Sequence, residues 1–260
     1  MIGFKATAIY FSPTRTSKKG AEAIAEILDE DYRSIDVTML HHEMEAREFA
    51  TNDVVVFGAP VYGGRLYKGC LPMIQKFKGN NTPCIVTVTY GNRHYDDALL
   101  ELSDLVTTLG FIPIAGAALV GEHTFGEIEI GRPNEKDIQE DSEFASKVKM
   151  ILEEKSIIRE VDCVKLPGNK SYKEGGTGGG FRPSTLDGCV NCKLCARNCP
   201  TQAIDYEDIT IVNNEKCISC FRCIKSCPVK AKVCDSENYV TFAEGFTQRL
   251  AESRTNEYFM

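Results

Sequence analysis

The sequence lacks the features of an exported or membrane-spanning chain. Its first residues, MIGFKATAIYF, contain no basic region followed by the long apolar stretch that an export signal requires. The later apolar run FIPIAGAALV, at 111–120, is far shorter than the roughly 20 residues of a membrane helix. We therefore expect neither an export signal nor a membrane anchor, and we expect a cytoplasmic protein.

A basic stripe that could neutralise phosphates is also missing. The formal net charge is -7, and residues 1–153 carry 15 Lys and Arg against 23 Asp and Glu, a balance of -8. Residues 186–235 carry 7 against 6, a balance of +1. Nucleic acid is therefore not expected as a partner. An acidic surface suits docking to basic patches on other proteins, although it can serve solubility alone.

What is present is an ordinary globular composition, with 43% hydrophobic and 26% charged residues in a chain of 260. Residues 1–153 alternate short apolar runs with segments of helical period, which predicts an α/β fold with a doubly wound, five-stranded parallel sheet. No G-x-G-x-x-G follows the first strand, so a resident nicotinamide cofactor is not supported. The expected strands are 4–11, 33–38, 53–58, 84–90 and 111–120, and the expected helices are 16–30, 71–78, 95–109 and 135–154.

The second half of the chain has a different organisation. Residues 175–180 are GGTGGG, which indicates a flexible linker or a loop packed close to something, because so much glycine cannot hold regular structure. A last helical segment is expected at about 238–256. The predicted units are a first domain at 1–156, a glycine-rich linker at 157–185, a smaller α+β domain at 186–235 and a helical tail at 236–260.

Twelve cysteines without an export signal favour metal ligation over disulfides, because the cytosol keeps thiols reduced. Nine of them lie between Cys189 and Cys234, and eight form two C-x2-C-x2-C-x3-C-P runs related by an offset of 28 residues. This spacing and its duplication predict two 4Fe-4S clusters, with structural zinc or disulfides as the alternatives. Cys234, Cys70, Cys84 and Cys163 are interpreted as small apolar residues rather than ligands.

The expected ligation is crossed, because the fourth cysteine of each run is carried away behind a proline and reaches the other cluster. Apolar neighbours such as Val190, Ile218 and Phe221 are expected to shield the clusters from solvent. Residues 186–235 resemble the bacterial two-cluster ferredoxins. The expected ligand sets are Cys189, Cys192, Cys195 and Cys227 for the first cluster, and Cys217, Cys220, Cys223 and Cys199 for the second.

Three loops of the first domain follow strands and could bind one ligand. In IYFSPTRTSKKGAEAIA, at 9–25, hydroxyls and main-chain N–H groups precede a helix, as in a phosphate site or an ordinary helix cap. GAPVYGGRLY, at 58–67, offers an aromatic side chain and glycines that let main chain approach a ring. TYGNRHYDDAL, at 89–99, follows the fourth strand. Ligands of doubly wound sheets bind at such strand ends.

On these loops, residues 1–153 resemble a flavodoxin domain, and the whole chain resembles the flavodoxin and ferredoxin fusion proteins of anaerobic prokaryotes. The resemblance implies FMN, with Tyr62 and Tyr95 stacking on the ring and Asn92 bonding its polar edge. Arg15 departs from it, since flavodoxins usually have glycine within this loop. The implied FMN residues are Ser12, Thr14, Arg15, Thr16, Ser17, Ala59, Pro60, Val61, Tyr62, Gly63, Gly64, Tyr90, Gly91, Asn92, Arg93 and Tyr95.

Two functional hypotheses follow. In the first, the protein is an electron-transfer flavoprotein-type carrier that relays electrons between FMN, two clusters and soluble redox proteins, with Arg93 raising the flavin potential. In the second, the clusters feed an FMN-dependent reductase of a small organic acceptor. His123 could serve near the flavin, or it could be structural. A fold that has lost its flavin is a further alternative because of Arg15, and a homodimer is possible.

Overall fold

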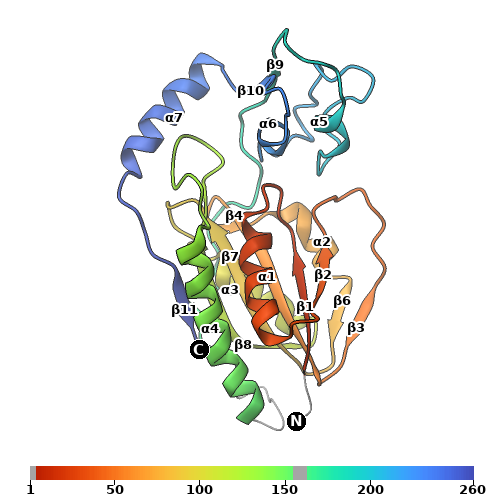
Figure 1. The fold of residues 1–260 in the computed structure, drawn as a ribbon, viewed down its shortest axis with the longest axis vertical. Coiled ribbons are helices and arrows are strands. Elements are labelled where there is room, and N and C mark those ends of the chain that lie inside the picture. The colour runs from red at the N-terminus through yellow and green to blue at the C-terminus, as the bar shows by residue number, and fades with distance from the viewer. Residues whose placement is uncertain (1–3, 155–162) are drawn as a thin grey trace.

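The computed structural model describes residues 4–154 and 163–260, and its centre is a mainly parallel β-sheet (Figure 1). Five strands pair in parallel in the order β2-β1-β4-β7-β8. In chain order this is 2-1-3-4-5, the doubly wound order of flavodoxin-like folds, and it confirms the predicted fold class. The strands are β1 (Lys5–Tyr10), β2 (Arg33–Asp36), β4 (Asp53–Tyr62), β7 (Thr82–Tyr90) and β8 (Phe111–Val120).

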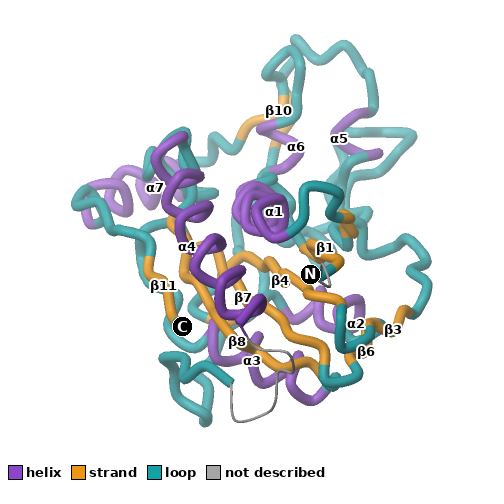
Figure 2. Tube along the Cα trace, turned by 60° about the horizontal axis from the view of Figure 1, so that its bottom comes forward, coloured by secondary structure: helices purple, strands orange, loops and turns teal. Residues whose placement is uncertain are grey.

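Helices cover both faces of this sheet (Figure 2). Helices α1 and α4 lie together on one face, where they bury residues such as Ile24 and Phe144. Helices α3 and α2 cover the other face with Leu99, Leu102 and Met73. Two apolar layers thus sandwich the strands, as crossover connections require. The helices are α1 (Thr16–Leu28), α2 (Leu71–Ile74), α3 (Ala98–Thr108) and α4 (Glu135–Glu154).

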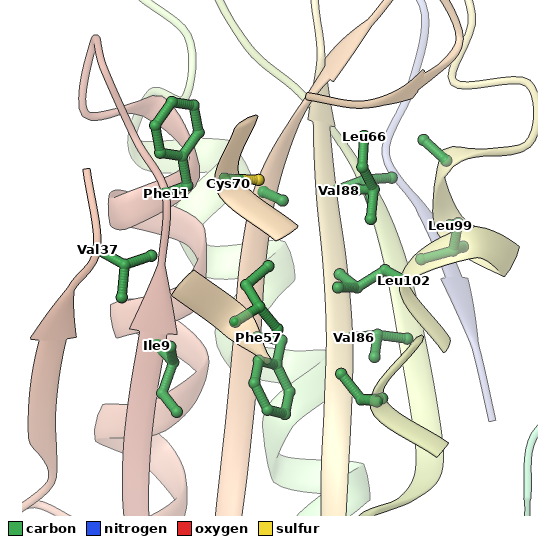
Figure 3. Packing of buried hydrophobic residues seen from close by; sticks show 14 of the residues in the cluster. Ile9, Phe11, Val37, Phe57, Leu66, Cys70, Val86, Val88, Leu99 and Leu102 are labelled. Carbon is green, nitrogen blue, oxygen red and sulfur yellow. The ribbon is translucent and has the colours of Figure 1, made fainter. Parts of the chain in front are cut away.

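Successive residues of each central strand serve opposite layers of the core. Ile9 and Phe57 belong to the α2 and α3 side, and Figure 3 shows them among Phe11, Val86 and Leu102. Their strand neighbours, including Ala8 and Val56, belong to the α1 and α4 side. The central strands are therefore apolar without alternation, which is why they were recognisable in the sequence.

The expected helix at 71–78 is wrong beyond its first turn. A short 3-10 turn, η1 (Lys68–Cys70), leads into α2, which ends at Ile74. Strand β6 (Phe77–Gly79) then pairs in parallel with β3 (Arg47–Phe49) at the margin of the fold. Burial of Phe77 and Phe49 against the core favours the extended form over a continued helix.

The cysteine-rich part forms a small unit above the carboxyl ends of the parallel strands (Figure 1). It consists of two similar halves, each with a four-residue helix and a set of left-handed residues at equivalent positions. Asn191 and Ser219, 28 residues apart, have φ values of 51° and 54°. Its elements are β9 (Ser184–Thr185), which pairs antiparallel with β10 (Lys232–Val233), together with α5 (Leu194–Arg197) and α6 (Arg222–Lys225).

The C-terminal tail differs from the single helix expected at 238–256. Helix α7 (Glu237–Arg249) ends earlier, and the chain then descends along the first domain to β11 (Glu257–Phe259), which pairs antiparallel with β8. The tail is tied down by polar groups of the first domain, such as Asn92 and Asp141. The boundary predicted between 156 and 157 lies outside the described residues. No described helix is long and apolar enough to span a bilayer.

Candidate cofactor cleft and cluster site

A cavity of about 360 Å3 lies at the carboxyl ends of β1, β4 and β7, between the sheet and the cysteine-rich unit. Its size is that of a small-molecule site. It lies beside the switch point of the sheet, between β1 and β4, where doubly wound folds bind ligands. All three loops expected from the sequence line it, and they contribute Pro13, Thr14, Thr16, Pro60, Val61, Tyr62, Gly63, Tyr90 and Gly91.

The loop after β1 is shaped by its own polar groups. The main-chain N–H of Ser12 donates to Thr38 Oγ1 at 2.9 Å, and Ser12 Oγ accepts from the N–H of Lys18 at 3.0 Å. Arg15, directly before α1, has φ of 68°, the left-handed region that glycine prefers. The chain therefore makes a left-handed turn with arginine in place of glycine, and Arg15 is exposed whereas Thr14 and Thr16 are half-buried.

Three buried hydroxyls in this region have no hydrogen-bond partner within the described residues. They are Ser17 Oγ at the start of α1, and Thr89 Oγ1 and Tyr90 OH at the end of β7. Buried polar atoms are almost always paired, and Thr89 and Tyr90 line the cavity, so their hydroxyls point to a polar ligand. Ser17, like Ser12 and Arg15 of the expected set, lies outside the cavity lining. FMN would offer phosphate, ribityl hydroxyls and ring carbonyls, and the start of a 13-residue helix suits its phosphate. The residues present thus fit FMN.

The loop after β4 contributes an aromatic wall. Tyr62 lines the cavity, and its ring lies 5.1 Å from that of Tyr67, which stacks in turn on Phe11 at 5.5 Å. Gly63 has φ of 62°, so the turn after Tyr62 favours glycine. Ala59 and Gly64, also expected at the site, lie outside the cavity lining.

Only some of the expected residues in the loop after β7 line the cavity. Tyr90 and Gly91 line the cavity, whereas Asn92, Arg93 and Tyr95 do not. The Asn92 amide donates to the carbonyls of Leu250 and Glu252 at 2.9 and 2.8 Å, and its oxygen accepts from the N–H of Arg254 at 2.8 Å. All three bonds hold the C-terminal tail.

The two other residues of this loop are also engaged elsewhere. Arg93 pairs with Asp96, and Tyr95 OH donates to Glu257 Oε2 at 2.9 Å while its ring stacks on His94. Tyr95 is 3% exposed, so little of its ring is free to meet a ligand. Of the two stacking tyrosines implied by the resemblance, Tyr62 alone borders the cavity.

A fourth loop, absent from the expected residue set, completes the cavity on the first domain. Residues 122–125 follow β8 and line the cavity. His123 Nδ1 lies 2.8 Å from the main-chain N of Phe125 and 3.0 Å from its carbonyl oxygen, so it accepts from the N–H in one ring tautomer and donates to the carbonyl in the other. Burial lowers the pKa of His123 to about 4, and nearby Lys225 and Arg93 act in the same direction. The His123 ring is therefore uncharged at the cavity wall in neutral solution.

The opposite wall comes from the cysteine-rich unit and the glycine-rich segment before it. Ile218, Ser219 and Cys220 line the cavity together with 177–179. A Cβ at Gly178 would lie 2.5 Å from Ile218 Cα, so only glycine permits this approach. The structure therefore supports a loop packed closely against the cysteine-rich unit, and not the flexible linker that was the other interpretation of the glycine-rich segment.

An aromatic cluster fixes the two units against each other. The Phe125 ring, from the first domain, lies 5.4 Å from Phe181, 5.2 Å from Phe221 and 6.0 Å from Phe242. Tyr239 of α7 contacts the rings of Phe125, Phe181 and Phe221. Edge-to-face pairs of this kind add to the free energy of burying the rings. The cluster holds the second cysteine run beside the cavity.

The two cysteine runs present similar local geometry. The N–H of Ala203 donates to Cys199 Sγ at 3.2 Å, and the N–H of Ala231 donates to Cys227 Sγ at the same distance. Burial raises the pKa of the Cys220 thiol to about 12, so this thiolate forms only as metal binding displaces the proton. No three His, Cys, Asp or Glu side chains of the described residues converge around one point as ligands of a single ion would.

The environments of the two runs differ. Val190 is 63% exposed, whereas its counterpart Ile218 is 6% exposed and lines the cavity. Phe221 is buried as expected. The expected apolar shield therefore covers the second run but leaves Val190 in solvent. Of the scattered cysteines, Cys70 and Cys84 are fully buried in the core, as small apolar residues would be.

Residues 188–231 match the family model described as a 4Fe-4S dicluster domain. This segment contains all eight cysteines of the two runs, so the chain carries a domain for two 4Fe-4S clusters. No curated protein sequence matches the chain.

Solved structures resemble the first domain. A flavodoxin from the domain Archaea is 14% identical, with 58% of this chain and 99% of that chain covered and a TM-score of 0.36. The oxidised Flavodoxin 2 from Bacillus cereus is 14% identical, with 57% and 99% covered and a TM-score of 0.38. Because these scores are low, the fold assignment rests on the strand order of the sheet. A flavodoxin-like fold joined to a two-cluster domain supports a role in electron transfer.

Proposed function

We propose that the protein is an electron carrier that relays electrons between FMN, its two 4Fe-4S clusters and soluble redox proteins. The observation that carries this proposal is the position of Cys220. This cysteine of the second run lines the same cavity as Thr14 and Tyr62 of the expected FMN loops. A cluster ligand at the wall of a flavin site favours direct electron exchange.

In this proposal the first domain holds FMN through its strand-end loops. The loop 12–17 would bind the phosphate, with Ser17 Oγ and the N–H groups at the start of α1 as donors. Tyr62 would stack on the ring, Tyr90 OH would donate to one of its polar atoms, and the uncharged His123 ring would lie beside it. Asn92, Arg93 and Tyr95 support the site indirectly, since their side chains engage the C-terminal tail and Asp96.

The crossed ligation of the clusters is part of the proposal. Cys217, Cys220, Cys223 and Cys199 would hold the cluster nearer the cavity, and the other four cysteines of the runs would hold the one nearer solvent. FMN exchanges electrons singly or in pairs and each cluster exchanges one, so the chain would join two-electron and one-electron chemistry.

The exposed side of the first run suits contact with a partner. Val190, 63% exposed, directly follows Cys189, and Val229, 44% exposed, lies two residues after Cys227; both cysteines belong to the first ligand set. We infer that soluble redox proteins meet this side. A cytoplasmic location, a homodimer and the four units predicted from the sequence also belong to the proposal.

Anaerobic reconstitution tests the function. The purified chain should bind one FMN and about eight iron atoms with matching sulfide. The reduced protein should then pass electrons to ferredoxins or flavodoxins faster than to quinones, nitro compounds and enones. Sustained turnover of one small acceptor, with no transfer to proteins, would replace the carrier by the flavin-dependent reductase. Failure to bind FMN would contradict both.

A further inference from the structure

Two cationic side chains of helix α6, which lies inside the second cysteine run, contact loops of the first domain. Arg222 Nη1 donates to the carbonyl oxygen of Pro13 at 2.8 Å. Lys225 Nζ lies 2.6 Å from Glu122 Oε1, with both side chains about one-third exposed. Pro13 and Glu122 both line the cavity of the proposed FMN site. The second cysteine run therefore contacts two of the loops that shape this site.

We propose that the second cysteine run forms part of the FMN site, so that FMN binding and assembly of the second cluster are thermodynamically coupled, with Arg222 as the positioning residue. The inference rests on the proposed function, because it takes FMN as the ligand of the cavity. It adds that neither cofactor reaches its full affinity without the other.

Charge complementarity supports this coupling. A second cavity of about 250 Å3 adjoins the phosphate loop and is lined by Thr14, Arg15, Arg222, Lys225 and three further residues, none of them acidic. Arg222 Nε is buried and has no hydrogen-bond partner among the described residues. A guanidinium with a free donor beside the expected phosphate loop suits an anion, and FMN carries its negative charge at that end.

The glycine-rich segment, which forms one wall of the FMN cavity, is hydrogen-bonded to the same cysteine run. Ser219 Oγ lies 2.7 Å from the carbonyl oxygen of Gly179 and 2.8 Å from Arg182 Nη1. The N–H of Gly179 donates to the carbonyl oxygen of Ile218 at 3.3 Å. Ser219 lies between two expected ligands of the second cluster, Cys217 and Cys220. Ordering of this ligand loop therefore also orders residues 177–179, which line the FMN cavity.

Residues 189–200, the first cysteine run, do not line the FMN cavity, although Asn198 lines the adjoining second cavity. Leu194 and Arg197 stand 28 residues before Arg222 and Lys225. Arg197 Nη2 donates to the carbonyl oxygen of Cys192 at 2.9 Å, within its own half. Coupling is therefore expected to act through the second run, and Arg197→Ala, which removes an arginine from the corresponding helix α5, is the control for Arg222→Ala.

FMN titration under anaerobic conditions tests the coupling. Quenching of flavin fluorescence gives the Kd for the cluster-loaded protein and for the same protein after iron removal. We expect binding at least about 10-fold weaker without clusters, within the range usual for linked sites. In the loaded protein, Arg222→Ala should weaken FMN binding at least about 5-fold and Arg222→Lys less, whereas Arg197→Ala should change Kd less than about 2-fold.

A reciprocal measurement guards against loss of the fold on iron removal. Linkage requires FMN to stabilise the second cluster as the cluster stabilises FMN. FMN should therefore slow the release of about half the iron to a chelator in the wild type and in Arg197→Ala, but not in Arg222→Ala. Equal release with and without FMN in the wild type would overturn the coupling while leaving the carrier function intact. Absence of FMN binding by loaded wild type would overturn the proposed function itself.

Discussion

Tyr62, at the end of β4, and Cys220, in the second cysteine run, line the same cavity although 158 positions separate them in the sequence. The first domain and the cysteine-rich unit thus both contribute side chains to one cavity. An aromatic side chain that suits a flavin ring lies across one cavity from an expected ligand of an iron–sulfur cluster.

The aromatic cluster around Phe125 is expected to hold the cysteine-rich unit in place. Phe125→Ala removes ring contacts with Phe181, Phe221 and Phe242 and should destabilise the packed interface by roughly 2 to 4 kcal/mol. Limited proteolysis should then cleave the glycine-rich segment faster. Ile130→Ala is the control, because Ile130 is 67% exposed and its loss should cost little. Equal cleavage of both variants would show that the cluster does not fix the units.

Asn92 is expected to anchor the C-terminal tail. Asn92→Gly keeps the main-chain turn, since Asn92 has φ of 62°, but it removes three hydrogen bonds to residues 250–254. At about 1 kcal/mol for each bond, the tail should loosen measurably. Hydrogen exchange at residues 257–259 should accelerate at least about 10-fold.

The matched control for this change is Asn81→Gly. Asn81 also has a positive φ, 53°, but its side chain is exposed and makes no hydrogen bond in the described part of the chain. This variant should leave exchange at β11 unchanged. If the two variants gave the same exchange rates, the anchoring role of Asn92 would be wrong.

The buried carboxyl group of Asp141 is expected to make the stability of the protein depend on pH. Burial raises the pKa of this carboxyl to about 7, with Asp137 and Glu140 adding to the effect, while the hydrogen bond from Tyr258 OH at 2.8 Å opposes it. The unfolded pKa is about 3.9, so the folded state binds more protons between about pH 4 and pH 7. The contribution of Asp141 to stability is therefore lost as pH rises through this window.

Asp141→Asn tests this assignment. The variant avoids the cost of ionising a buried carboxyl and keeps an oxygen that can accept from Tyr258 OH. It should raise Tm over wild type at pH 8, by an amount equivalent to roughly 2 to 4 kcal/mol, and much less at pH 5. Glu153→Gln, at an exposed site on the same helix, should show no such difference. A Tm shift equal at both pH values would contradict the account.

The cysteines outside the runs are expected to be dispensable for the clusters. Cys220→Ser should remove the second cluster and lower the iron content from about eight to about four atoms per chain. Cys234→Ser should keep about eight, because Cys234 lies outside both runs. Iron and sulfide analysis of the anaerobically purified variants measures this. Loss of iron from Cys234→Ser, with iron retained in Cys220→Ser, would reverse the ligand assignment.

The sequence predicted the parts of the fold whose signals are local. Strand β8 and helix α4 match their expected ranges because a continuous apolar run and a long amphipathic period mark them. The eight cysteines were recognisable from spacing alone. Strand β11 has three residues and exists only because β8 offers a free edge, so no local pattern could predict it.

The candidate site was predictable in outline but not in detail. The three strand-end loops meet at one cavity, as the parallel sheet requires. Asn92 and Tyr95 have the side-chain chemistry of flavin contacts, but their partners in the tail lie about 160 residues away. Likewise Val190 and Ile218 occupy equivalent positions of the repeat, and only docking of the second run on the first domain buries one and leaves the other exposed.

Electron exchange within one molecule tests the central claim most directly. Loaded protein is partly reduced by a light pulse under anaerobic conditions, and flavin and cluster absorbance are followed separately. The account predicts that electrons redistribute between FMN and the clusters with a first-order rate that stays constant over a tenfold range of protein concentration, and that Cys220→Ser abolishes this phase. A rate proportional to protein concentration, or one unchanged in Cys220→Ser, would contradict it.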